Sequence, residues 1–414
     1  MKANRSRLML LLFLLLVSHP LIGSRLTTGA LVLVASWTIL RSHFKVPKRA
    51  LVLMLLPGAL VVLGMLGSSS HYLRDVLKDS WYYTFPMLAV FTGYILARSC
   101  KNAESILMTF VVAGAVLSVW HLAEFITHRE LLQTGDLGEL RDQIGSGFML
   151  SSVSPMILYL ASRSGVKLFD PRTRAIPLAI YAVTLASVAC AFSRTMVISA
   201  LVSFVAGLGW LTTKNKRGMI VIGLLIGVLF GLNAVVPEDS SSFLGKFAQT
   251  REEISYTDFG TTADAIHHWR AYETLMATAT YLGGNGIQKA VGMGFGQLVD
   301  IGIDVELGGT VMHEIPIFHN GYVYVLVKTG YVGLALFLVY LARLYVVGAR
   351  HVQKSDRKNQ MLGGLLMAMI SMVAVSTFVV SGWFNPSLIC AITMLIGSLL
   401  SFLSRAQSEN EIVM

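Results

Sequence analysis

Charged residues are scarce in this sequence. Only 14% of the 414 residues are Asp, Glu, Lys or Arg, whereas 54% are hydrophobic, and the mean hydropathy is +0.65. This balance excludes an ordinary soluble domain and predicts a protein with many membrane spans. The excess of 33 basic over 23 acidic residues is then mainly a topology signal, and we expect no nucleic-acid partner.

Cysteines and metal-binding patterns are also sparse. The three cysteines, Cys100, Cys190 and Cys390, form no disulfide framework. A Cys190–Cys390 bridge is one alternative, but two buried thiols are favoured. No Asp-x-Asp motif occurs, which disfavours a metal-dependent transferase, so we predict no metal and no cofactor. We interpret the acidic run at 304–306 as a solvated patch.

The first apolar segment lacks a small-residue cleavage site, so we expect an uncleaved anchor. A bilayer core about 30 Å thick needs roughly 20 apolar residues for each helical span. The sequence predicts an all-α integral membrane protein, a single polytopic domain over residues 1–414. It has about twelve transmembrane helices, at 8–23, 28–40, 50–67, 84–98, 104–127, 147–162, 176–192, 195–213, 218–236, 321–342, 360–380 and 388–404.

The basic residues indicate how these spans are oriented, because cytoplasmic segments are enriched in Lys and Arg. With the N-terminus inside, 22 of the 33 Lys and Arg lie in inner segments, at 2–7, 41–49, 98–101, 163–174, 214–217, 343–358 and 405. We therefore expect both termini in the cytoplasm. The long segment 237–320, between the ninth and tenth spans, then lies on the opposite side of the membrane.

This long loop contains an amphipathic helix in "TTADAIHHWRAYETLMATATYL". Thr261 and Asp264 have the spacing of a capping box. At 100° per residue the helix has two sides. The apolar side consists of Trp269, Tyr272, Leu275 and Met276. The polar side, which we expect to face a cavity, consists of His267, Arg270, Thr274 and Thr278. The glycines of "VGMGFGQ" that follow are interpreted as turn formers.

Three residues on the outer side are candidates for chemistry. Arg194 lies in a short connection between the seventh and eighth spans, Arg270 on the amphipathic helix, and His319 at the start of the tenth span. A guanidinium group grips phosphate oxygens in pairs, and a histidine can accept a proton from a hydroxyl. The alternatives are a snorkelling Arg194, a solvated Arg270 and a histidine that only caps its helix.

Other polar residues lie within the predicted spans. Lys328 is nine residues from His319, about 180° round the helix, so we expect it to avoid the histidine's pocket and to pair with another group or a carbonyl. Gly330 and Gly333 would let another helix approach closely and fix the tenth span. His121 and Glu124, one turn apart, either line the site or pair structurally.

The chain resembles the bacterial O-antigen ligase and polymerase superfamily. The resemblance is carried by Ser193-Arg194, by Trp269-Arg270, by the glycine-rich turn, and by His319-Asn320 followed by Gly-x-x-Gly, in this order over about residues 190–340. It implies a GT-C-like membrane glycosyltransferase in the bacterial inner membrane, with a periplasmic site. Arg194 and Arg270 would bind the diphosphate and His319 would activate the acceptor, with Asn320, His267, Trp269 and Glu124 as possible supporting residues.

The implied reaction is metal-independent and inverting, and it belongs to lipopolysaccharide or other surface polysaccharide biosynthesis. A ligase would move a glycan from undecaprenyl diphosphate to lipid A-core oligosaccharide. A polymerase would join two lipid-linked units, but it often has a second large outer loop, which this chain lacks. A transporter of lipid-linked glycans, a different class, tends to place polar groups near the membrane midplane in two related halves.

Overall fold

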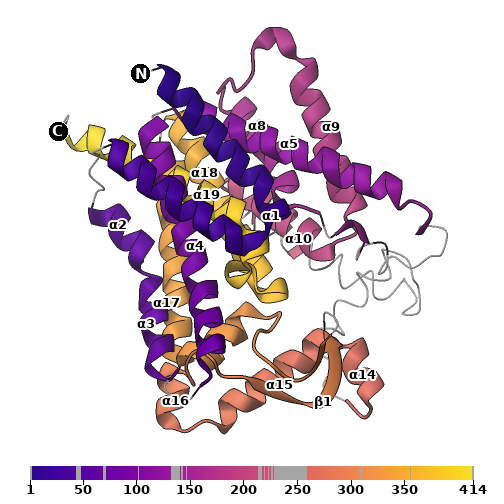
Figure 1. The fold of residues 1–414 in the computed structure, drawn as a ribbon. Coiled ribbons are helices and arrows are strands. Elements are labelled where there is room, and N and C mark those ends of the chain that lie inside the picture. Colours follow the sequence, from indigo (N-terminus) through magenta and orange to yellow (C-terminus); the bar gives the residue numbers. More distant parts are fainter. Residues whose placement is uncertain are drawn as a thin grey trace.

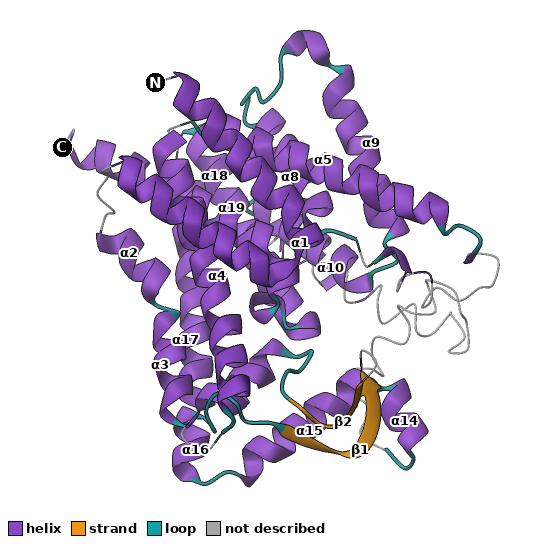
Figure 2. Cartoon of the chain, viewed as in Figure 1, coloured by secondary structure: helices purple, strands orange, loops and turns teal. Residues whose placement is uncertain are grey.

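The computed structural model describes residues 2–42, 48–68, 71–100, 102–131, 140, 143–145, 147–212, 217–218, 220–221, 223–224, 227, 259–307, 310–354 and 356–412. Most of these residues are helical (Figure 2). Both termini lie at one end of the helical bundle, and α14, α15, α16 and the strands lie at the other, which we call the loop end (Figure 1). Most of the ninth predicted span, 218–236, lies outside the described residues.

The N-terminal helices are broken by glycine and proline. Helix α1 (Lys2–Ser42) bends back sharply at Gly23, whose backbone φ of 73° and ψ of 166° are not helical, so the first two predicted spans are its two halves (Figure 1). The third predicted span is divided into α2 (Lys48–Leu55) and α3 (Gly58–Leu66), with Pro57 at the start of α3. Helix α4 (Leu73–Cys100) begins well before the predicted fourth span.

The middle of the chain follows the prediction closely. Its helices are α5 (Ala103–Thr127), α8 (Met149–Arg163), α9 (Ala175–Cys190) and α10 (Arg194–Gly207), with a short 3-10 turn, η2 (Pro171–Thr173), before α9. All three cysteines are free thiols, so Cys190 and Cys390 form no bridge; Cys390 is buried as expected, but Cys190 is only partly buried.

The C-terminal part consists of α17 (Gly321–Val352), α18 (Arg357–Val380), the 3-10 turn η3 (Gly382–Phe384) and α19 (Pro386–Ile412). Helix α19 packs closely against α4, where a Cβ added to Gly93 or Gly397 would meet the backbone of the other helix. Within the described part of the chain, five helices are long and apolar enough to cross a membrane, and three shorter apolar helices accompany them. The total of twelve spans stays a prediction.

The loop end is not purely helical, which corrects the all-α prediction. Helices α14 (Thr262–His267), α15 (Trp269–Gly283) and α16 (Gly286–Val291) precede an antiparallel pair, β1 (Val299–Leu307) and β2 (Thr310–Ile315). Apolar residues alternate along "VDIGIDVEL", and Val299 and Ile301 are fully buried. This period of two is the pattern of a half-buried strand. The predicted acidic patch lies on this strand, where Asp304 and Glu306 are exposed.

Candidate functional site

A cavity of about 120 Å³ at the loop end brings the three predicted residues together. Arg194, Arg270 and His319 all line it, although they come from α10, α15 and the segment before α17. Thr195, Thr274 and Asn320 add polar groups, and the remaining lining is apolar, from Ile198, Ala271, Val375, Phe378 and Val379. We call this space the arginine cavity.

Arg194 owes its position to a tight connection between α9 and α10. Only residues 191–193 separate the two helices, as predicted. Phe192 has a φ of 45°, a conformation that non-glycine residues rarely adopt. Ser193 then caps α10, because its Oγ accepts a hydrogen bond at 3.3 Å from the backbone N–H of Met196. Arg194 is therefore fixed as the first residue of the helix.

Arg270 lies at the start of α15, just after a break in the predicted amphipathic helix. The capping box of Thr261 and Asp264 is present, but it begins only the short α14, and His268 interrupts the helix. Arg270 and Thr274 line the arginine cavity, so the polar side of the helix faces a cavity as predicted. On the apolar side of the helix, Leu275 is 41% exposed.

His319 is held by a buried carboxylate. The Glu273 side chain is only 3% exposed, and its Oε2 accepts two hydrogen bonds, from the His319 backbone N–H at 2.9 Å and from His319 Nδ1 at 2.8 Å. Because an ionised carboxylate only accepts hydrogen bonds, Nδ1 carries the proton and Nε2 is the basic nitrogen. The His319 side chain is 42% exposed, so substrate can reach this ring.

Glu273 was missed in the sequence, although a signal for it exists. It is four residues after Trp269 and one after Tyr272, so it falls on the apolar side of α15. An acidic residue at such a position needs a buried partner. Helix α16, the glycine-rich turn and the β-hairpin separate α15 from His319 along the chain. The sequence alone therefore could not identify His319 as the partner of Glu273.

Asn320 positions the histidine from the other side. Its Oδ1 accepts hydrogen bonds from the backbone N–H groups of Tyr322 and Val323, at 3.1 and 3.3 Å, and so caps α17. The carbonyl of His319 accepts a hydrogen bond from the backbone N–H of Ser381, which directly follows α18. His319 is thus fixed by contacts with α15, with α17 and with the end of α18.

Helix α17 bends at Gly330, and the bend sets the direction of its first half. Gly330 has a φ of 66°, and an added Cβ would lie 2.3 Å from the carbonyl oxygen of Ala290. The bend leaves nearby helix carbonyls without helical donors. The glycine-rich turn supplies them: the N–H groups of Met293 and Gly294 donate to the carbonyls of Val327 and Lys328, at 2.8 and 3.2 Å. The predicted close approach of another helix is confirmed at Gly330, where α16 is the partner, but not at Gly333, where the nearest atom outside α17 to an added Cβ belongs to Leu60, at 3.6 Å.

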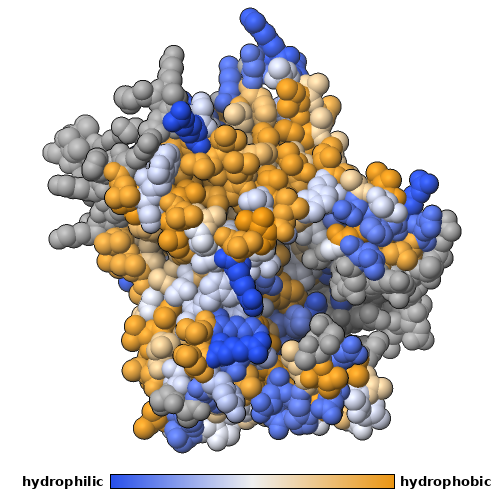
Figure 3. Space-filling model, viewed as in Figure 1, coloured by the Kyte–Doolittle hydropathy of each residue, from blue (hydrophilic) through white to orange (hydrophobic). Residues whose placement is uncertain are grey.

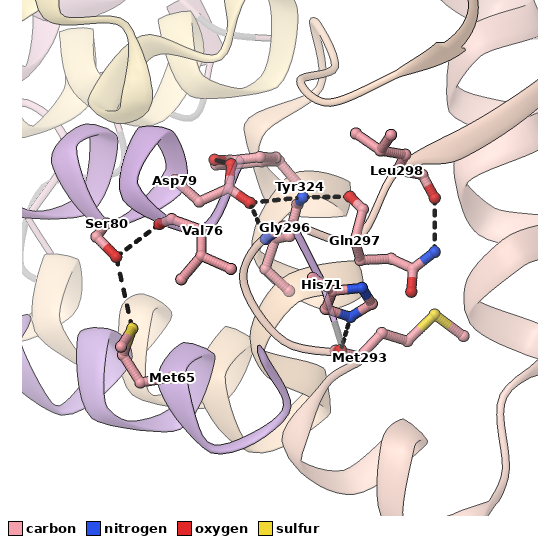
Figure 4. Close-up of polar contacts among 11 residues, drawn as sticks. Met65, His71, Val76, Asp79, Ser80, Met293, Gly296, Gln297, Leu298 and Tyr324 are labelled. Atoms are coloured by element: carbon pink, nitrogen blue, oxygen red, sulfur yellow. Dashed lines mark hydrogen bonds and ion pairs between the residues drawn. The ribbon is translucent and has the colours of Figure 1, made fainter. Parts of the chain in front are cut away.

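A buried ion pair ties the same turn to α4. Asp79 and Lys328 are almost fully buried, and Lys328 Nζ lies 2.7 Å from Asp79 Oδ2. Asp79 also accepts hydrogen bonds from Tyr324 Oη at 2.5 Å and from the Gly296 N–H at 2.7 Å, while Lys328 donates to the Gln297 carbonyl (Figure 4). The prediction for Lys328 is confirmed, since it pairs with an acid and a carbonyl and does not line the arginine cavity.

Among the remaining candidates, those whose side chains the structure describes do not line this cavity. Trp269 packs partly buried against the core, its ring 6.3 Å from that of Tyr272. Glu124 accepts a hydrogen bond from Trp120 Nε1 at 3.0 Å and is partly exposed, and His121 is buried with Nδ1 3.0 Å from Ser187 Oγ. His121 and Glu124 line neither arginine-lined cavity, and each has a partner other than the predicted one, so they do not form a pair with each other. The side chain of His267 lies outside the described residues.

A second cavity, of about 240 Å³, adjoins the first through the two arginines. Arg194, Thr195 and Arg270 line both spaces, and the second also includes Gly147, Ser193 and Asn385. Two guanidinium groups between two cavities can bind an anion that extends from one into the other. His319, which can act as a base, lines the first of these two cavities.

A scan against protein-family models and a search of curated proteins both find no match for this chain. The geometry of the site therefore carries the functional argument below.

Proposed function

We propose that this protein is a membrane glycosyltransferase of the O-antigen ligase type. It transfers a glycan from undecaprenyl diphosphate to a hydroxyl of lipid A-core oligosaccharide at the periplasmic face of the bacterial inner membrane. The observation that carries the proposal is the convergence of Arg194, Arg270 and a carboxylate-bound His319 on one cavity. These residues also carry the resemblance to the O-antigen ligase superfamily.

The two arginines serve the leaving group. When the bond between the sugar C1 and the diphosphate oxygen breaks, negative charge develops on that oxygen. Fixed cations at that point stabilise the transition state more than the ground state. Arginine suits this task because its donors pair with two phosphate oxygens at once and its charge is permanent.

His319 serves the acceptor. Nε2 takes the proton from the acceptor hydroxyl as its oxygen forms the new bond to C1, and the electrons of the broken bond leave with the undecaprenyl diphosphate. Glu273 holds Nδ1 and stabilises the imidazolium that forms, as a carboxylate behind a histidine does in other enzymes. Direct displacement of this kind inverts the configuration at C1.

The apolar part of the arginine cavity suits a substrate whose tail remains in lipid. Phe378, on α18, is 44% exposed and lines the cavity, together with Val375 and Val379. A diphosphate that meets the arginines would then keep its polyprenyl chain beside the apolar surface of α18. Helices α17 and α18 are among the five described helices that are long and apolar enough to cross a membrane.

Transfer by purified protein tests the proposal. The protein in lipid nanodiscs receives undecaprenyl diphosphate-linked glycan together with either lipid A-core or a second lipid-linked glycan, with and without added divalent cations. We expect transfer to lipid A-core without added metal, and its loss in His319→Ala, Arg194→Ala and Arg270→Ala at normal protein level. Arg129→Ala is the control, because Arg129 is exposed and lines neither cavity.

Each other outcome points to a different function. Elongation with the second lipid-linked glycan alone would replace the ligase by the polymerase. Consumption of neither substrate by the wild-type protein would favour a transporter, and wild-type rates in all three variants would exclude the site.

A further inference from the structure

A second cationic site lies between α1 and α4. Arg25 and Thr28 of α1 face Arg74, Lys78, Trp81 and Tyr82 of α4 across a groove of about 740 Å³. We call it the cationic groove. The rings of Trp81 and Tyr82 have centroids 4.9 Å apart, and Trp81 Nε1 donates to Thr28 Oγ1 at 2.9 Å. This bond joins the two walls, so the groove is part of the folded structure.

The three cations of the groove need an explanation. In the described part of the chain, Arg25, Arg74 and Lys78 form no ion pair with a carboxylate, and Asp75, on the same helix, does not line the groove. All three belong to segments predicted to be non-cytoplasmic, where Lys and Arg are usually avoided. Two segments far apart in sequence therefore supply three cations to one place, which favours a multiply charged anion.

The surroundings of the groove indicate that this anion belongs to a lipid. Large apolar side chains are exposed beside it, among them Leu26, Tyr72, Leu73 and Leu77, which are 60–80% exposed. Figure 3 shows a hydrophilic patch in the middle of this face, directly below a broad hydrophobic area. Exposed apolar area of this extent marks contact with a membrane or a partner, and aromatic residues such as Trp81 are typical of the membrane–water interface.

A further cavity links the groove to the arginine cavities. It measures about 300 Å³ and shares Arg25, Trp81 and Tyr82 with the groove. At its other end it shares Asn385 with the second arginine cavity. It also includes Ser381, whose N–H donates to the carbonyl of His319. The groove is therefore connected to the candidate site through this linking cavity.

We propose that the cationic groove binds the phosphorylated headgroup of a membrane-anchored acceptor lipid, whose sugar part reaches His319 through the linking cavity. The role of this lipid as acceptor rests on the proposed function. The binding of a phosphorylated lipid headgroup by Arg25, Arg74 and Lys78 does not. Donor and acceptor lipids would then approach the histidine from two different sides of the bundle.

Lipid binding by a protein that cannot turn over tests this site. His319→Ala protein in detergent is titrated with bis-phosphorylated lipid A, with lipid A stripped of its phosphates, and with phosphatidylglycerol, and inorganic phosphate is added as a competitor. The charge-removing pair Arg74→Gln and Lys78→Gln is compared with Arg129→Gln and Lys289→Gln, a matched pair outside the groove. Near a membrane surface each cation contributes about fivefold, so we expect about 25-fold weaker binding of bis-phosphorylated lipid A in the first pair alone.

The other probes identify the ligand. We expect phosphate-free lipid A and phosphatidylglycerol to bind more weakly and to be insensitive to the Arg74 and Lys78 changes. Equal binding of lipid A by both double variants overturns the proposal. If phosphatidylglycerol binds with the same affinity as bis-phosphorylated lipid A, the groove is a general contact for anionic lipids. If inorganic phosphate displaces lipid A, the groove is a site for free phosphate.

The two proposals fail in different ways. Normal lipid A binding through the groove by a protein without transfer activity would leave the groove in place and refute the transferase. If transfer depends on His319 but not on Arg74 and Lys78, and the Arg74 and Lys78 changes leave lipid A binding unchanged, the transferase is supported and the groove is refuted.

Discussion

Removing the Glu273 carboxylate tests how His319, the proposed base, is held. This buried oxygen accepts two hydrogen bonds from His319, one from its backbone and one from its ring. A hydrogen bond to a charged group is worth roughly 1.5–3 kcal/mol, so Glu273→Ala loses about 3–6 kcal/mol of positioning. We therefore expect a loss of roughly 10²- to 10⁴-fold in kcat, which is the range attributed to general-base catalysis.

The isosteric variant separates charge from geometry. Glu273→Gln keeps one neutral acceptor oxygen for Nδ1–H, so the ring stays in place but the imidazolium loses its counter-charge. We expect an intermediate loss of about tenfold to 10²-fold in kcat, with the KM for the lipid-linked donor nearly unchanged, because neither variant alters the arginines. The conservative Glu273→Asp should recover part of the rate.

The assay is glycan transfer by purified protein, with kcat and KM measured separately. Leu275→Ala is a matched control on the same helix, because this leucine is exposed and lines neither arginine cavity, and such changes usually alter stability by less than about 0.5 kcal/mol. Transfer by Glu273→Ala within about threefold of wild type would refute the reasoning. An effect confined to KM would assign Glu273 to donor binding.

Three further predictions concern the arginines and the support of α17. Arg270→Lys keeps the charge but loses the paired donors, so we expect transfer to fall about 10- to 100-fold, and a rate equal to wild type would contradict bidentate binding. Lys328→Ala leaves Asp79 buried without its cation and should destabilise the fold by about 3–5 kcal/mol, whereas the double variant Asp79→Asn, Lys328→Met should regain most of this, as measured by thermal unfolding. Gly330→Ala forces a side chain into a left-handed conformation and against the Ala290 carbonyl, so we expect a loss of at least about 1–2 kcal/mol and reduced transfer, in contrast to the open position Gly283→Ala.

The sequence pointed to residues that line the arginine cavity, but not to the buried acidic residues that hold this part of the structure in place. Arg194, Arg270 and His319 were found because each is a polar group at the end of an apolar segment, and their predicted side of the membrane made a common cavity plausible. The orientation of Lys328 followed from helical periodicity alone. In contrast, Asp79 and Glu273 act through partners 249 and 46 residues away, as their ion pair and hydrogen bond show, and spacing along one helix contains no information about such contacts.

Irregular backbone was the other source of error. Gly23 and Gly330 bend α1 and α17 within long apolar runs, and composition alone does not distinguish a bent helix from two spans or from a straight one. The β-hairpin was missed because a helix signal dominated the loop, although the alternation from Val299 to Leu307 was visible. The Gly330 bend and the glycine-rich turn together set the direction of the helix that begins after His319, and so they bear on the proposed site.

The most direct test of the central claim is a structure of the protein with undecaprenyl diphosphate bound. The account predicts that the diphosphate lies within hydrogen-bond distance of both Arg194 and Arg270, with its polyprenyl chain along α18 and with His319 Nε2 facing the position of the departing sugar. Diphosphate density elsewhere, or in contact with only one arginine and remote from His319, would contradict it.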